Sequence, residues 1–144
     1  MVAGRMEHPG RAGGLLDRAD GLLLQAAAEP DSRERFRTAY LAALRGAGAV
    51  LALTGADRAP RARSRNAWVL MQQAAPEFVM WSDYFSSFSE TRAAIEAGLD
   101  RPVDAQVADE FVSRVGAFLH DVEDSISAAA RMRPITGWLA DGSA

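Results

Sequence analysis

The chain has 144 residues, which is enough for one domain, and its formal net charge at pH 7 is −3. Hydrophobic residues make up 49% and charged residues 24%, a balance typical of a globular domain and not of a disordered chain. The absence of cysteine excludes disulfides, zinc–thiolate sites and iron–sulfur clusters. All sixteen basic residues are arginine, a bias typical of a GC-rich genome, so lysine-based chemistry is excluded as well.

The start of the chain has no apolar segment, and residues 1–13, rich in glycine and arginine, are predicted to form a flexible tail. No apolar run anywhere approaches the roughly 18 residues of a membrane span. We therefore expect a cytoplasmic protein that has no association with a membrane.

Two helices are predicted in the first part of the chain. From Leu15 onward, leucines and alanines recur at helical spacing until Pro30 ends the run. A second helix starts at Asp31, where Glu34 completes a capping-box-like sequence, and ends near Gly55.

The second helix contains the sequence GAGAVL, at residues 46–51, which invites comparison with a dinucleotide-binding loop. That loop needs a preceding strand and a third glycine, and this segment has neither. The small residues instead predict that a neighbouring helix approaches closely.

Residues 56–65, ADRAPRARSR, form a predicted linker with four arginines against Asp57, a net charge of +3. Guanidinium groups bind a nucleic-acid backbone by charge and by bidentate hydrogen bonds, so this linker is a candidate nucleic-acid-binding segment. No aromatic residue alternates with the arginines, so it is not a base-stacking platform. An ordinary solvated loop is the alternative. The candidate binding residues are Arg58, Arg61, Arg63 and Arg65.

A third helix is predicted from about Ser64 to Ala75, and Pro76 then opens a fourth that ends at Gly98. Ser89 marks a point where the fourth helix restarts or kinks. Its aromatic residues stand at the spacing of a buried face, which favours core packing over base stacking. They are Phe78, Trp81, Phe85 and Phe88.

The fifth predicted helix begins near Asp104 and carries the longest apolar stripe, which continues to Ala129. No segment alternates as a strand does. We therefore predict an all-α fold, an antiparallel bundle of four to five helices over residues 14–131, followed by a C-terminal tail over residues 132–144.

Acidic residues dominate the region between Pro76 and Glu110, where eight carboxylates oppose Arg92 and Arg101, a net charge of −6. Such a surface repels phosphate and suits a basic protein partner, or the arginine linker of a second subunit. A solvated acidic face is the alternative. The carboxylates are Glu77, Asp83, Glu90, Glu96, Asp100, Asp104, Asp109 and Glu110.

The sequence RVGAFLH places Arg114 six residues before His120. Histidine transfers protons near neutral pH and arginine stabilises a phosphorane, so such a pair suits metal-independent RNA cleavage. On a straight helix, however, the two side chains lie about 120° and about 9 Å apart. A helix irregularity or a second subunit must then complete the site. The alternative is that the two residues are exposed neighbours without a catalytic function.

The segments AWVLMQQAAPEFVMWSDYFSSFSETRAAIEAG (67–98) and ADEFVSRVGAFLHDVEDSI (108–126) resemble a bacterial branch of the HEPN superfamily, the "higher eukaryotes and prokaryotes nucleotide-binding" domains. The resemblance covers about residues 12–131. It implies a homodimeric, metal-independent endoribonuclease acting on RNA, with Arg114 and His120 as the matching catalytic positions. Active members usually have a polar residue after the arginine, where this chain has Val115.

Other HEPN members are inactive and serve as binding or assembly modules for a protein partner, in DNA-repair or toxin–antitoxin systems. The sequence has no Glu-x-x-His pair of the kind that holds two metals in a bundle. It also has no P-loop and no Gly-x-Ser-x-Gly motif. We therefore expect neither a metal nor a cofactor, and both the catalytic and the non-catalytic hypothesis stay open.

Overall fold

Helices make up almost all of the part of the chain that the structure describes. This computed structural model describes residues 10–59 and 66–142, with side chains as far as Met132. The α-helices in these ranges are α1 (Gly10–Ala28), α2 (Ser32–Thr54), α3 (Ala67–Ala74), α4 (Val79–Ser86), α5 (Ser89–Glu96) and α6 (Ala105–Gly142), with two 3₁₀ turns, η1 (Ala56–Arg58) and η3 (Pro76–Phe78). The described ranges contain no strand, and the all-α prediction is confirmed.

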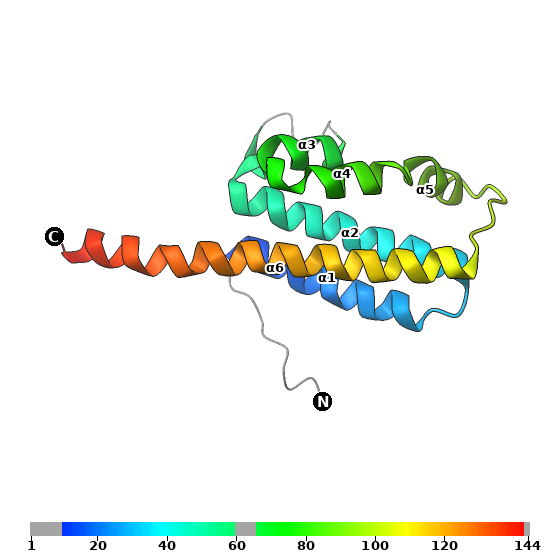
Figure 1. Ribbon diagram of the computed structural model, residues 1–144, viewed down its shortest axis with the longest axis horizontal. Coiled ribbons are helices and arrows are strands. Elements are labelled where there is room, and N and C mark those ends of the chain that lie inside the picture. Colours follow the sequence, from blue (N-terminus) through cyan, green and yellow to red (C-terminus); the bar gives the residue numbers. More distant parts are fainter. Residues whose placement is uncertain (1–9, 60–65, 143–144) are drawn as a thin grey trace.

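The helices form a bundle in which α1 runs antiparallel to α2 and to α6, whereas α2 and α6 run in the same direction (Figure 1). The three long helices α1, α2 and α6 pack side by side, and the short helices α3, α4 and α5 form a layer that covers α2 and α6. The C-terminal part of α6 extends beyond the end of the bundle. None of the helices in the described ranges is long and apolar enough to cross a membrane.

Several helix ends lie where local sequence signals place them. The carboxylate of Asp31 accepts a hydrogen bond from the backbone N–H of Glu34 at 3.0 Å and so caps α2. Gly55 ends α2 with a φ of 83°, and Gly98 follows α5 with a φ of 76°, a left-handed conformation that glycine adopts without strain. The fourth predicted helix is divided before Ser89, as its sequence suggested.

Other boundaries differ from those predicted. α1 begins at Gly10, before the predicted start at Leu15, because Gly13 is buried in the bundle and tertiary packing offsets its poor helix propensity. α3 begins at Ala67 because Asn66 caps it by accepting a hydrogen bond from the N–H of Trp68. The backbone of α6 stays helical to Gly142, through most of the predicted C-terminal tail. Residues 1–9 of the predicted N-terminal tail lie outside the described residues.

Aromatic side chains form the centre of the core. Phe36 of α2 and Phe111 of α6 have ring centroids 4.6 Å apart, and the rings of Trp68 and Phe85 are 4.8 Å apart. The indole N–H of Trp68 donates a hydrogen bond to the hydroxyl of Tyr40 at 2.8 Å. The aromatic residues of the fourth predicted helix pack against this cluster, which confirms their role as core residues.

The close helix approach predicted from GAGAVL is confirmed at Gly46. A Cβ atom added there would lie 2.6 Å from Cδ2 of Leu119 and 2.8 Å from Cε2 of Phe118, closer than van der Waals contact. α2 and α6 therefore approach each other as closely as they do because position 46 has no side chain.

Candidate functional site

α6 carries both residues of the predicted catalytic pair. Phe111, Val115 and Phe118 are each 0% exposed, and they fix the rotation of α6 against α2 and α4. Arg114 precedes Val115, and His120 follows the buried Leu119. Both members of the pair are exposed.

The structure does not bring Arg114 and His120 together within one chain. α6 is unbroken between them, so their separation of six residues turns about 240° and rises about 9 Å, which leaves them about 120° apart around the axis. The helix irregularity that could have joined them is therefore not present. Completion of the site by a second subunit remains a prediction.

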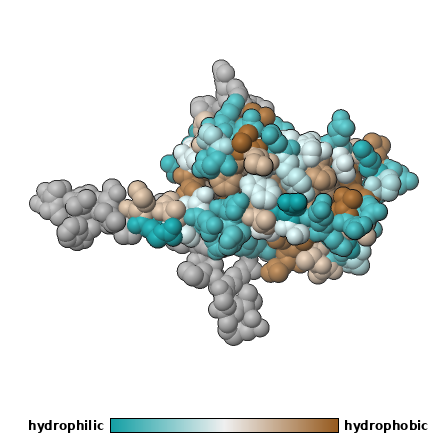
Figure 2. Space-filling model, in the orientation of Figure 1, coloured by the Kyte–Doolittle hydropathy of each residue, from teal (hydrophilic) through white to brown (hydrophobic). Residues whose placement is uncertain are grey.

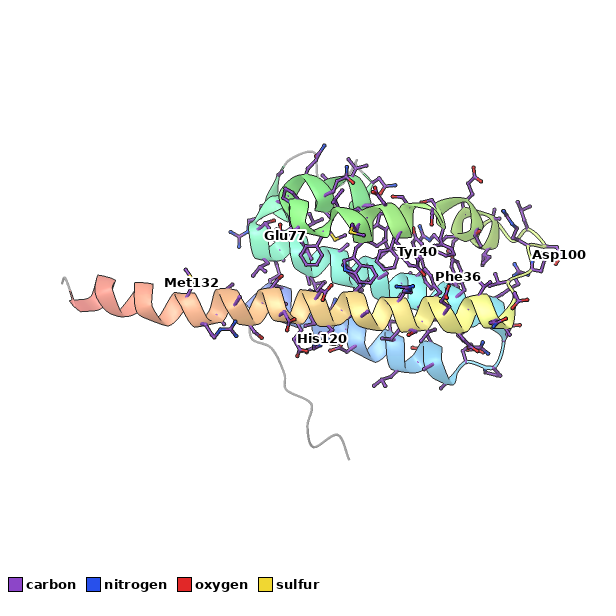
Figure 3. The ribbon with its side chains drawn as sticks, viewed as in Figure 1. Phe36, Tyr40, Glu77, Asp100, His120 and Met132 are labelled. Carbon is purple, nitrogen blue, oxygen red and sulfur yellow. The ribbon has the colours of Figure 1, made fainter. Side chains whose placement is uncertain are left out.

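The two side chains face different surroundings. Arg114 lies on the α4 side of α6, where its charge acts on Tyr84 of α4. Burial raises the pKa of the Tyr84 phenol, and the positive charge of Arg114 partly offsets that rise. His120 lies on the side of α6 away from α4 (Figure 3), with its side chain 71% exposed and its Nε2 atom 3.8 Å from Oδ2 of Asp124. A phosphate that contacted one residue would not reach the other in the same protomer.

Several carboxylates lie near Asp121, the residue that follows His120. Asp121 accepts a hydrogen bond from the indole N–H of Trp81 at 2.9 Å. It helps to line a hollow of about 230 Å³ between α4 and α6, which we call the acidic hollow. Its lining residues are Glu77, Phe78, Trp81, Asp121, Asp124 and Ser125. No pattern in the sequence indicates this hollow, because its residues come from separate helical segments.

The charge of the acidic hollow determines what it can bind. Three carboxylates in one hollow repel the phosphates of RNA and attract a cation. The aromatic ring of Trp81 beside them suits the flat guanidinium of an arginine side chain. No group of three or more histidine or acidic residues within the described ranges could hold a metal ion.

The predicted nucleic-acid-binding linker is only partly described. Arg58 is exposed at the end of η1, whereas Arg61, Arg63 and Arg65 lie outside the described residues. Asp57 forms a two-point ion pair with Arg11 of α1, at 2.8 and 2.9 Å. The single acidic residue of the linker is thus already paired, and the charge of Arg58 is not offset by it.

A family model matches residues 26–123, which is more than half of the chain and includes both Arg114 and His120. The matching family is the SAV_6107-like HEPN family. The chain belongs to this HEPN family. No significant match to the chain is found among curated proteins or among solved structures. The HEPN match runs from the end of α1 into α6, so it includes the whole α3–α5 layer and the RVGAFLH segment.

Proposed function

We propose that this HEPN protein is a non-catalytic binding or assembly module that works in a nucleic-acid system and captures a basic protein partner. One observation carries the proposal: a continuous α6 holds Arg114 and His120 on different faces, with His120 beside Asp124. Because these two side chains of one protomer cannot contact the same phosphate, they cannot together catalyse its cleavage.

The surface between α4 and α6 supports the choice of partner. Figure 2 shows hydrophobic residues scattered among hydrophilic ones on the face that Figure 1 presents. On α4, the side chain of Met80 is 81% exposed, next in the chain to Trp81 of the acidic hollow. A partner that offers arginine or lysine beside apolar groups would complement both features.

Binding of an oligoarginine peptide, followed by fluorescence anisotropy, tests this function. We expect salt-sensitive binding that the double variant Glu77→Gln with Asp124→Asn weakens about fivefold, since exposed ion pairs contribute up to about 1 kcal/mol each. Glu90→Gln with Asp100→Asn makes the same charge change elsewhere and should have less than half of that effect. Equal weakening by both double variants would reject the acidic hollow as the binding surface.

A metal-independent endoribonuclease that acts at a dimer cleft is the second candidate. The observation that favours it is that Arg114 and His120 are both exposed and therefore accessible to a second copy of the chain. On this hypothesis the protein cuts single-stranded RNA in EDTA, and Arg114→Ala and His120→Ala each abolish cleavage. Mixing the two inactive variants should restore part of the activity if each site combines residues of both subunits. Absence of any cleavage that depends on His120 supports the non-catalytic proposal.

A further inference from the structure

A second hollow of about 230 Å³ lies where α2, α3 and α5 meet, and we call it the arginine hollow. It shares no residue with the acidic hollow or with the Arg114–His120 pair. Its lining residues are Tyr40, Leu44, Asn66, Ala67, Trp68, Ser89, Arg92 and Ala93. The proposed function leaves this hollow without a role.

Arg92 is the charged residue of the arginine hollow. Its guanidinium carbon lies 5.3 Å from the ring centroid of Tyr40. Within the described ranges, no carboxylate comes within ion-pair distance of Arg92. Glu96, one turn along α5, is paired instead with Arg37 at 2.7 Å. A half-buried positive charge without a counterion is an arrangement that an anion would stabilise.

Neutral hydrogen-bond donors line the same hollow. Tyr40 is only 3% exposed; its hydroxyl accepts a hydrogen bond from Trp68, and its own O–H has no acceptor among the described residues. Ser89 lies one helical turn before Arg92, on the same side of α5, and its hydroxyl also donates to no described residue. The hollow therefore combines one guanidinium with two hydroxyl donors that have no acceptor among the described residues.

We propose that the arginine hollow binds the phosphate group of a small phosphorylated ligand, with Arg92 as the charged anchor and Ser89 and Tyr40 as hydrogen-bond donors. The volume of about 230 Å³ is below the roughly 300–1,000 Å³ of pockets that enclose whole ligands, so it suits the phosphate alone. A phosphate offers three oxygens to the guanidinium and the two hydroxyls, whereas a carboxylate offers two. The proposal is independent of the acidic hollow and of its partner.

Titration of the full chain with inorganic phosphate, followed by nuclear magnetic resonance, tests the proposal. The ionic strength is held constant with chloride, because salt alone screens exposed charges. We expect a saturable shift of the Trp68 indole N–H resonance, which reports on the arginine hollow, and no shift of the Trp81 indole resonance. Arg92→Gln should weaken the affinity about tenfold and Ser89→Ala about threefold, as loss of a charged and of a neutral hydrogen bond would.

Arg101→Gln is the matched control, since it removes an exposed arginine that does not line the arginine hollow. It should change the phosphate affinity by less than about twofold, within the usual effect of an exposed charge. An unsaturable response of the wild-type chain, or equal weakening by Arg101→Gln and Arg92→Gln, would overturn the proposal. Equal binding of acetate would overturn the assignment to phosphate. Ser89→Ala keeps the test valid if Arg92→Gln does not fold.

Discussion

Gly46 determines how closely α2 and α6 pack, and the same substitution at two glycines tests this. Gly46→Ala gains about 1 kcal/mol of helix propensity but overpacks against Phe118 and Leu119, which costs about 1–3 kcal/mol. We expect a net fall of about 1 kcal/mol in the free energy of unfolding. Gly21→Ala, where a Cβ atom meets nothing within 4 Å, should raise it by about 0.5–1 kcal/mol. Urea denaturation measures both, and stabilisation by both variants would contradict the close contact.

The raised pKa of Tyr84 should make the stability of the fold depend on alkaline pH. Burial raises its pKa above the usual 10.0, so the folded state holds the phenolic proton more tightly than the unfolded state does. The resulting stabilisation is complete below about pH 10 and is lost as the pH rises through the higher folded-state value. We expect Tyr84→Phe to lose less stability than the wild-type chain over that alkaline range, as measured by denaturation at several pH values. An identical alkaline loss in the variant would refute the raised pKa.

Among the elements, α2 shows how a single cap supports a central helix. Asp31→Ala removes the hydrogen bond to the N–H of Glu34 and should lower the free energy of unfolding by about 1 kcal/mol. Asp31→Asn keeps an acceptor at the same position and should cost only a few tenths of that. Chemical denaturation followed by circular dichroism compares the two. Equal losses would assign the effect to the charge of Asp31 and not to its hydrogen bond.

Helices whose ends depend on local contacts could be predicted from the sequence. The Asp31 cap and the glycines at 55 and 98 act within one turn, so their sequence signals correspond directly to structure. The start of α1 depends instead on burial of Gly13 against the rest of the bundle. Packing of that kind joins residues far apart in the chain, which a local pattern does not record.

Two hollows of opposite charge lie among the residues that the structure describes, and neither could be predicted from the sequence. Three carboxylates line the acidic hollow between α4 and α6. Arg92 is the charged residue of the arginine hollow between α2, α3 and α5. The spacing of Arg114 and His120 predicted the angle between them, because both belong to one regular helix. Asp121 and Trp81 come from different helices, so their hydrogen bond depends on how the bundle packs.

The two parts of α6, one packed in the bundle and one extending beyond it, should contribute differently to the free energy of unfolding. Among the described residues, its last buried apolar side chain is Ile126, and the helix then extends beyond the bundle (Figure 1). A chain that ends at Met132 should therefore keep its free energy of unfolding within about 0.5 kcal/mol of the full chain. Ile126→Ala in the full chain should cost about 2–4 kcal/mol, since it leaves a cavity in the core. If the shortened chain loses as much as Ile126→Ala does, residues after 132 belong to the folded domain and the predicted limit at residue 131 is wrong.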